Sequence, residues 1–328
     1  MIYLTGATGF IGSRVARRLL ALGEQLRCLV RSQTKSAWLA KAGGVDLLFG
    51  NIDDVDVHER GMRGASSAIH LAAIYDLGIV DEVAMRRTNV SGTRAFLEGA
   101  RRAKVARSIY VSTTVALGPG VAEPLEAYDG PYHSVYHQTK AEAHRLARSA
   151  QRAGDPVIIV CPSFVYGPGD EGPAGRFVDD IRHRKLPALL SDPAHFSFVF
   201  VDDVADAIVA ALKRGGVGEV YLFTGVNASM NEFATAVARE AKVKAPALRF
   251  PVAIARPLGR VLDVISRATR MRFPINYEGV VTTSRDKWLH THERAAQDLD
   301  YAPRSIEEGL RATLRDENLP PEIVSDDA

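Results

Sequence analysis

The sequence predicts an α/β protein with a doubly wound parallel sheet of the Rossmann type and a smaller, mainly C-terminal α/β lobe. Three observations predict this class. Short β-branched runs alternate with longer helical patterns over the first two-thirds of the chain, a glycine-rich turn follows the first run, and the alternation becomes less regular after Pro162. Apolar runs separated by helices are typical of βαβ units and of a parallel sheet buried on both faces.

The individual strands and helices are indicated by the residues that bound them and by the spacing of their apolar residues. Polar or glycine residues bound each short run, and apolar residues recur every three or four positions between the runs, as in an amphipathic helix. Residues 11–22 and 82–103 carry such helical patterns. The strands expected in the sheet are residues 2–5, 26–30, 45–49, 67–71, 108–112 and 157–161.

The part of the chain after Pro162 begins with a loop at 167–175 that is rich in glycine, proline and acidic residues. We interpret the chain beyond this loop as a lobe packed over the carboxyl ends of the strands. A strand, a helix and a strand are expected first, at 198–201, 204–213 and 220–223. Further helices are expected at 230–241, 252–269 and 305–315.

These patterns divide the chain into two domains and a tail. Residues 1–162 are expected to form a dinucleotide-binding domain that also receives segments near 198–225. Residues 163–197 and 226–318 are expected to form the substrate-binding lobe. Residues 319–328 combine two prolines with an acidic end, a composition that predicts disorder.

The composition is that of an ordinary soluble globular protein, and we expect its partner to be a small-molecule substrate. The formal net charge of +2 is too small to indicate a nucleic-acid partner, and no apolar run approaches the ~20 residues needed to span a bilayer. Cys28 and Cys161 fall in apolar runs and are expected to be buried and reduced. The first expected strand begins at residue 2, which leaves no room for a signal peptide, so we expect a cytoplasmic protein.

Two groups of polar side chains indicate no special chemistry. His133 and His137 share helical spacing, but no third ligand is apparent, so no metal site is expected. Arg14, Arg17 and Arg18 lie on an expected helix and are interpreted as a solvated face.

The motif TGATGFIG at 5–12 follows a strand and opens a helix, the context in which a glycine motif indicates a dinucleotide site. Gly6 permits the tight turn, Gly9 lets the backbone approach a pyrophosphate, and Gly12 lets helix and strand pack closely. The helix N-terminus offers free N–H groups to the phosphates. The alternative is a plain glycine turn. The residues expected at the coenzyme here are Gly6, Thr8, Gly9, Phe10, Ile11 and Gly12.

The end of the second strand bears on the choice of coenzyme. NAD-binding folds commonly place an acidic residue there, but this strand runs into Arg31 and Ser32, with Lys35 close behind. The planar guanidinium of arginine matches a 2′-phosphate, so the sequence favours NADP(H). If Arg31 is only a solvated cation, NAD(H) is the alternative. Further expected contacts, which flank the adenine or allow close backbone approach, are Asn51, Ile52, Leu71, Ala72 and Ala73.

A tyrosine and a lysine four residues apart, Tyr136 and Lys140, begin a later helical pattern. An ordinary tyrosine, with a pKa of about 10, is a slow acid or base at neutral pH, and a neighbouring ammonium moves that pKa toward the working range. A hydroxyl from the end of the fifth strand could hold a substrate oxygen against the phenol. Ser112, Thr113 and Thr114 are all available, although β-propensity alone also explains threonines in a strand.

Over nearly its whole length the sequence resembles the extended short-chain dehydrogenase/reductase superfamily. The motifs that carry the resemblance are TGATGFIG at 5–12, HLAA at 70–73, TNVSGT at 88–93, STTVALG at 112–118, YHQTK at 136–140, PSFVYGP at 162–168 and VDDVADA at 201–207. The resemblance implies that Tyr136 is the catalytic acid/base and that Lys140 both tunes it and binds the nicotinamide ribose. It also implies a catalytic hydroxyl at Thr113, with Ser112 as the fallback.

The same resemblance implies supporting residues and a quaternary state. Asn89 matches an asparagine that supports the active-site architecture, while Pro162 and Ser163 begin a segment that lines the nicotinamide. Members of the superfamily are often homodimers, formed through the helices that correspond to 82–103 and 136–152 here, and some are monomers.

The resemblance also bears on the substrate. Sugar-nucleotide epimerases of this superfamily usually hold a diphosphate with an arginine, but Phe196 lies near the corresponding position here. An apolar pocket, or simply core packing, would explain a group of aromatic residues, Phe164, Phe177, Phe196 and Phe198. Tyr75 and Thr114 are also expected at the pocket. The closer resemblance is to dihydroflavonol-reductase-like and 3β-hydroxysteroid-dehydrogenase-like members, which handle lipophilic ketones and alcohols.

The sequence supports three functional hypotheses. The leading one is an NADP(H)-dependent oxidoreductase that transfers hydride between the nicotinamide and a ketone, an aldehyde or a secondary alcohol of a lipophilic small molecule. The second is an NAD-dependent sugar-nucleotide epimerase or dehydratase. The third is a catalytically silent NADP-binding sensor, for which a tuned phenol would be unnecessary.

Overall fold

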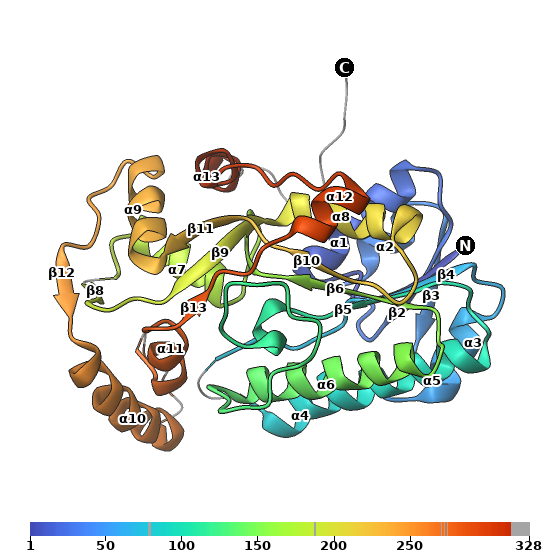
Figure 1. Ribbon diagram of the computed structural model, residues 1–328, viewed down its shortest axis with the longest axis horizontal. Helices are drawn as coiled ribbons and strands as arrows, with labels where there is room; N and C mark the ends of the chain where they lie inside the picture. Colours follow the sequence, from blue (N-terminus) through green and yellow to red (C-terminus); the bar gives the residue numbers. More distant parts are fainter. Residues whose placement is uncertain (78–79, 187, 270, 272, 274, 316–328) are drawn as a thin grey trace.

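The computed structural model describes residues 1–315 except 78, 79, 187, 270, 272 and 274. Its centre is a seven-stranded parallel sheet in the order β10-β6-β5-β4-β1-β2-β3, which confirms the predicted doubly wound fold (Figure 1). The strands are β1 (Ile2–Thr5), β2 (Leu26–Val30), β3 (Val45–Phe49), β4 (Ser67–His70), β5 (Ser108–Val111), β6 (Val157–Pro162) and β10 (Val220–Phe223).

Helices cover both faces of this sheet (Figure 1). On one face α1, α8 and α12 bury Leu19, Ile208 and Leu299 against the strands. On the other face α3, α5 and α6 bury Val57, Phe96 and Ala147. The helices are α1 (Phe10–Ala21), α2 (Ala37–Lys41), α3 (Val55–Met62), α4 (Glu82–Arg86), α5 (Gly92–Arg102), α6 (Val135–Arg152), α8 (Val201–Arg214) and α12 (Glu293–Leu299).

The long helix expected at 82–103 is present as three consecutive helical segments. A π-helical turn, η1 (Arg87–Ser91), joins α4 to α5. This turn carries Asn89, whose side chain is used at the site described below. A short 3₁₀ helix, η2 (Thr114–Leu117), begins just after the end of β5.

The arginines of α1 correct one expectation, because Arg14 and Arg18 are not a solvated face. The Arg14 Nε atom lies 3.3 Å from an Asp202 carboxylate oxygen, and Arg18 pairs with both Asp202 and Asp206. These acids belong to α8, which packs against α1 although it is nearly 190 residues away in sequence. The guanidinium of Arg17 stacks on Trp38, 4.4 Å from the ring centroid.

The lobe is built around a second sheet, in which β9 (His195–Phe200) pairs with β7 (Phe164–Tyr166), β11 (Val226–Ser229) and β13 (Lys287–Trp288). The strand expected at 198–201 therefore begins earlier and joins this sheet, whereas α8 and β10 join the main one. The other elements of the lobe are α7 (Pro173–Arg182), β8 (Ala188–Leu190), α9 (Met230–Glu240), β12 (Leu248–Phe250), α10 (Val252–Thr269), α11 (Tyr277–Thr282) and α13 (Ile306–Arg315).

Aromatic side chains fill the core of the lobe. Phe198 stacks on Phe233 with ring centroids 4.1 Å apart, and Phe196 stacks on Trp288 at 6.3 Å. The predicted tail at 319–328 lies outside the described residues. Within the part of the chain that the structure describes, no helix combines the length and apolar character that crossing a bilayer requires.

Candidate active site

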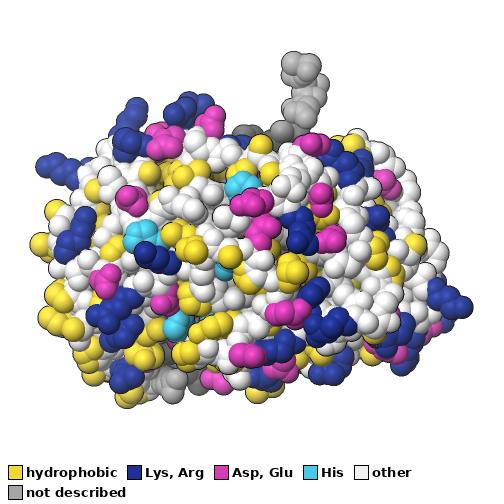
Figure 2. Space-filling view, viewed as in Figure 1, with side chains coloured by type: hydrophobic (Ala, Val, Ile, Leu, Met, Phe, Trp, Pro, Cys, Tyr) yellow, Lys and Arg dark blue, Asp and Glu magenta, His cyan; other side chains and the backbone are white. Residues whose placement is uncertain are grey.

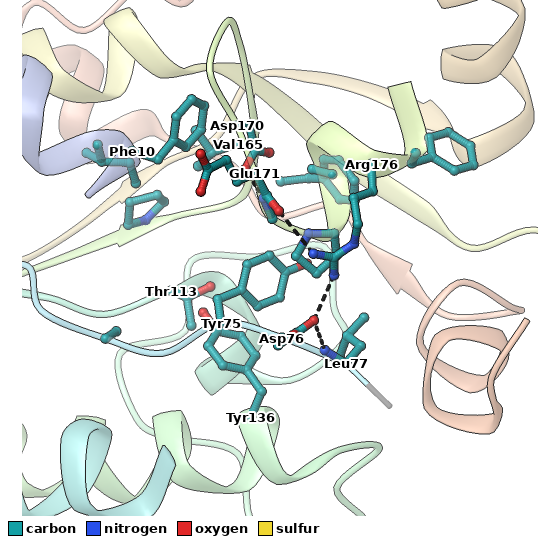
Figure 3. Close-up of a pocket in the computed structure, with 18 of the residues that line it drawn as sticks. Phe10, Tyr75, Asp76, Leu77, Thr113, Tyr136, Val165, Asp170, Glu171 and Arg176 are labelled. Atoms are coloured by element: carbon teal, nitrogen blue, oxygen red, sulfur yellow. Dashed lines mark hydrogen bonds and ion pairs between the residues drawn. The ribbon is translucent and has the colours of Figure 1, made fainter. Parts of the chain in front are cut away.

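A large cleft, of about 2550 Å³, lies between the carboxyl edge of the main sheet and the lobe. Its lining begins at the glycine turn after β1, passes the ends of β4, β5 and β6, and reaches α7 and α10. Because the strands are parallel, their carboxyl ends bring residues that are distant in sequence to one edge. Figure 3 shows the part of this cleft around Tyr75 and Tyr136.

The glycine turn is closely packed. Gly6 has a φ of +76°, and a Cβ atom there would lie 2.7 Å from the Ala72 nitrogen. A Cβ atom at Gly12 would lie only 2.1 Å from the Gly6 carbonyl oxygen, so helix α1 can approach the turn this closely only with glycine at that position. Gly9 precedes α1, and its own Cβ position has more room, 3.3 Å from the same oxygen.

Two features of the cleft fit a bound dinucleotide. The first is the N-terminus of α1, where Gly9, Phe10 and Ile11 line the cleft and the first backbone N–H groups have no acidic side chain to cap them. The second is Ser163, at the end of β6, whose buried hydroxyl oxygen has no hydrogen-bond partner among the described residues. A dinucleotide spanning the cleft would bring phosphate to the first and polar nicotinamide atoms to the second.

Of the residues expected around the adenosine, some line the cleft and others do not. Lys35 lines the cleft, but Arg31 and Ser32 are exposed and are not part of its wall. The loop is held by its own contacts, since Ser32 accepts hydrogen bonds from Lys35 and Ser36. Arg17 of α1 is exposed, as expected, and lines the cleft together with Lys35.

Of the contacts expected after β3 and β4, some residues line the cleft and others lie outside its wall. Leu71 and Ala73 line the cleft. Asn51 is exposed and Ile52 packs against Gly92, so neither forms part of the cleft wall. Ile52 is held away from the cleft because its carbonyl accepts a 2.7 Å hydrogen bond from His58. This bond holds the loop after β3 toward α3.

Asn89 connects three elements behind the cleft. Its amide oxygen accepts from the Ile74 nitrogen at 2.8 Å, and its amide nitrogen donates to the Ile74 carbonyl and to the Thr139 hydroxyl. The side chain is buried, and these bonds fix the loop after β4 against η1 and α6. Asn89 therefore positions Tyr75 and the N-terminal half of α6 rather than lining the cleft itself.

Helix α6 presents Tyr136 and Lys140 to the cleft from its first two turns. Ser134 caps the helix by accepting a hydrogen bond from the His137 nitrogen at 3.0 Å. The Tyr136 ring packs against Tyr75 with centroids 4.6 Å apart (Figure 3). Lys140 is buried, and its ammonium donates to the Val111 carbonyl at 3.0 Å.

The electrostatics of this pair differ from the sequence expectation. Burial raises the pKa of Tyr136 to about 12, and the opposing influence comes from a hydrogen-bonding interaction with Thr113. Lys140, whose ammonium lies over the Tyr110 ring, is not among the groups that lower this pKa. Burial lowers the pKa of the Lys140 ammonium itself to about 8.

The two candidate hydroxyls after β5 are in different environments. The Ser112 hydroxyl lies 2.8 Å from Nδ1 of His144, whose Nε2 lies 2.9 Å from the Leu125 carbonyl. Because a carbonyl only accepts, the proton must be on Nε2, and Ser112 donates its own proton to Nδ1. Thr113 instead accepts from the Val115 nitrogen at 3.3 Å, which leaves its proton for an oxygen in the cleft.

Several aromatic side chains contribute to the wall on the lobe side. Phe164, Phe177 and Phe196 line the cleft as expected, and so does Thr114, whereas Phe198 is buried in the lobe core. Trp288 also lines it and was missed. Nothing in the local sequence marks Trp288, because it reaches the cleft through the short pairing of β13 with β9.

Charged residues surround the cleft beside Tyr75, as Figure 3 shows. Arg176 of α7 donates to an Asp76 carboxylate oxygen at 2.7 Å and to the Glu171 carbonyl at 3.0 Å. The Asp170 carboxylate accepts from the backbone nitrogens of Gly172 and Gly175, and burial raises its pKa. Arg176 was also missed, since its role depends on a loop a hundred residues earlier.

No group of His, Cys, Asp and Glu side chains within the described residues could hold a metal ion. His133 lies 2.7 Å from an Asp286 carboxylate oxygen, and His137 packs between the rings of Tyr132 and Trp288. Both histidines therefore have structural partners in the lobe and its neighbouring loop.

Known proteins match both the sequence and the fold. The sequence model of the NAD dependent epimerase/dehydratase family matches residues 2–223. A 4-hydroxy-2-methyl-3-oxo-4-farnesyl-3,4-dihydroquinoline-1-oxide ketoreductase of Stigmatella aurantiaca is 29% identical over 94% of this chain and 94% of its own length. Sterol demethylase protein B of Methylococcus capsulatus is 30% identical over 80% of this chain and 81% of its own.

Solved structures agree with this match. The crystal structure of gox2253 has a TM-score of 0.80 and 29% identity, covering 96% of this chain and 97% of its own. Other relatives carry names of dihydroflavonol 4-reductase and 3β-hydroxysteroid dehydrogenase type, which confirms the predicted likeness to those branches.

Proposed function

This chain belongs to the NAD dependent epimerase/dehydratase family of extended short-chain dehydrogenases/reductases, and we propose that it is an NADP(H)-dependent reductase of lipophilic ketones or aldehydes. The family makes it an NAD(P)-dependent oxidoreductase; the coenzyme preference and the substrate class are the proposal. The observation that carries it is the half-buried phenol of Tyr136, next to the Thr113 hydroxyl, in the same cleft as the glycine turn.

The protonation state of Tyr136 supports reduction as the working direction. When bound, the coenzyme supplies a hydride to the carbonyl carbon. With a pKa of about 12, Tyr136 is protonated at neutral pH and can give its proton to the carbonyl oxygen, so that the two transfers together produce an alcohol. Thr113 donates a hydrogen bond to the same oxygen and holds it against the phenol.

On this proposal, Lys140 lies at the floor of the cleft, one helical turn from Tyr136. Its ammonium is fixed by the Val111 carbonyl at the end of β5, where it keeps a cation below the reacting groups. Because no lowering of the Tyr136 pKa comes from this cation, we assign it to the coenzyme rather than to the phenol. The same ammonium would reach ribose hydroxyls of the coenzyme from the floor of the cleft.

Mutation can distinguish the roles of the two hydroxyls after β5, those of Ser112 and Thr113. We expect Thr113→Val to lower kcat about 100-fold with little change in stability, because it removes a hydrogen bond made to the developing oxyanion. Ser112→Ala should lower kcat less than about tenfold but destabilise the fold by about 1–3 kcal/mol, the penalty of leaving His144 Nδ1 buried without a partner. Steady-state kinetics and urea unfolding of both variants test this. The reverse pattern would assign the catalytic hydroxyl to Ser112.

The choice of NADP(H) is supported by the basic residues at the adenosine end of the cleft. Arg17 and Lys35 line it, and Arg31 is exposed directly after β2, where no acidic residue is available to hold a ribose hydroxyl. We expect the double variant Arg31→Gln/Lys35→Gln to bind NADPH about tenfold more weakly and NADH unchanged. Lys41→Gln, an exposed cation on α2 outside the cleft wall, is the matched control. Equal weakening for both coenzymes would contradict the preference.

A lipophilic substrate is supported by the walls around Tyr136. Aromatic side chains contribute to the lobe side of the cleft. Beside Tyr75, the carboxylates of Asp76, Asp170 and Glu171 lie around Arg176, which already pairs with Asp76. A sugar nucleotide would bring two further negative charges toward these carboxylates. The names of the relatives support the same class, since one is a ketoreductase of a farnesyl-substituted compound and another is a sterol demethylase protein.

On this proposal the chain works as two domains. Residues 1–162 with α8 and β10 hold the coenzyme, and residues 163–197 and 226–315 hold the substrate over it. The aromatic wall is contributed by the second group, while Tyr136 and Thr113 come from the first.

A further inference from the structure

Helix α10 exposes an apolar stripe at the edge of the lobe. Ile254, Val261, Val264 and Ile265 lie on it, and Met271 comes two residues after its end; all five are between 40% and 67% exposed. Single exposed apolar residues are ordinary, but the four on the helix are separated by seven, three and one residues, which places them along one side of it. Such a continuous apolar stripe marks an interaction surface.

The opposite side of the same helix faces the cleft. Ala255, Asp263 and Ser266 are part of the cleft lining, and Ala255 and Ser266 are buried. The helix therefore has one buried side, which also includes Val252, and one side on which large aliphatic residues are exposed. It separates the cleft from the surface that carries the stripe.

The segment around α10 has a strong local excess of positive charge. Residues 242–276 contain eight lysines or arginines and one aspartate, a net charge of +7 in a chain whose net charge is +2. Arg249 and Arg260 are exposed, and Arg260 is held over the Tyr277 ring at 4.5 Å. In Figure 2 this end of the molecule, the lower left, shows yellow apolar atoms with dark blue basic groups between them.

This charge decides between possible occupants of the stripe. A second copy of the chain packed face to face would bring two strongly basic segments together, which is repulsive. An anionic lipid surface matches both properties, because it accepts aliphatic side chains at the headgroup boundary and attracts arginine and lysine. We propose that the outer side of α10 docks on an anionic membrane surface, with the cleft behind it open to lipophilic molecules.

This inference goes beyond the proposed reductase and can fail separately from it. The test is flotation of the full-length protein with vesicles of phosphatidylcholine alone and of phosphatidylcholine with phosphatidylglycerol. Binding is expected only to the second kind. Val261→Ser/Val264→Ser should weaken it at least about tenfold, because apolar area at the interface is lost without a change in charge. Arg249→Gln/Arg260→Gln should weaken it about fivefold for each charge removed.

Two controls keep the result specific. Val217→Ser removes an exposed valine from the loop before β10, far in sequence from α10, and should bind vesicles like the unchanged protein. The midpoint of urea unfolding should be the same in all variants, which shows that each is folded. The proposal is overturned if the unchanged protein does not float with anionic vesicles, if Val217→Ser weakens binding equally, or if size-exclusion chromatography shows that Val261→Ser/Val264→Ser converts a dimer to a monomer.

Discussion

Replacing Tyr136 by phenylalanine is expected to lower kcat about 1000-fold while the affinity for NADPH stays unchanged. The substitution removes one oxygen from a ring that keeps its packing against Tyr75, so the loss reports proton transfer rather than folding. The measurement is steady-state reduction of a lipophilic ketone, followed by NADPH absorbance, with coenzyme affinity from fluorescence titration.

Tyr75→Phe is the matched control for this variant. Tyr75 lines the same cleft and its ring lies 4.6 Å from that of Tyr136, but no proton transfer is assigned to it. We expect its kcat to remain within about tenfold of the unchanged enzyme, a shift typical of altered substrate positioning. If Tyr136→Phe retained near-normal turnover, or if Tyr75→Phe lost as much, the phenol of Tyr136 would not be the acid.

Replacing Gly12 by alanine is expected to be the most damaging change at the coenzyme site. The added Cβ would lie 2.1 Å from the Gly6 carbonyl oxygen and 2.8 Å from its carbon, and both are backbone atoms that cannot rotate away. Helix α1 would have to move off the turn, at a cost of about 3 kcal/mol or more, and the phosphate site would be lost. Urea unfolding and NADPH titration measure the two effects.

The Gly9→Ala variant tests coenzyme binding separately from the packing of the turn. Its Cβ would lie 3.3 Å from the Gly6 oxygen, a distance that a small adjustment relieves. This variant should therefore keep most of its stability, within about 1 kcal/mol, but bind NADPH weakly because the methyl group occupies the space where the pyrophosphate approaches. A Gly12→Ala protein that is as stable as the unchanged one and binds NADPH normally would contradict this interpretation of the turn.

Much of the main sheet could be predicted from the sequence because its signals are local. The first three strands begin and end at the expected residues, since each is an apolar run bounded by turn residues. The glycine turn was predictable for the same reason. Tyr136 and Lys140 were predicted from their spacing and their place after the fifth strand, and the family resemblance added their roles.

The lobe could be predicted only in outline, because its order depends on distant contacts. β13 has two residues and is held by pairing with β9 and with Gly120, both distant in sequence, so Trp288 carried no signal as a cleft residue. Arg14 and Arg18 were interpreted as solvated because their acidic partners lie on a helix far along the chain. The helix at 252–269 was predicted, but which of its sides faces the cleft was not.

Chemistry within the site was the least predictable part. Sequence spacing placed Lys140 one helical turn from Tyr136, yet its ammonium bonds the Val111 carbonyl, a contact that only the end of β5 can supply. From residue type alone, Ser112 and Thr113 were equivalent, because each offers a hydroxyl at the end of the fifth strand. They differ because His144, 32 residues after Ser112, takes the proton of one and not of the other.

Transfer of deuterium from labelled NADPH tests the proposed reaction most directly. The protein, freed of bound nucleotide, is mixed with NADPH deuterated at C4 of the nicotinamide and with lipophilic ketones and aldehydes, and the products are analysed by mass spectrometry. The proposed reduction predicts an alcohol with one deuterium on the former carbonyl carbon for each NADPH consumed. An isolated protein that retains NAD, consumes no added NADPH and instead interconverts a sugar nucleotide would contradict it.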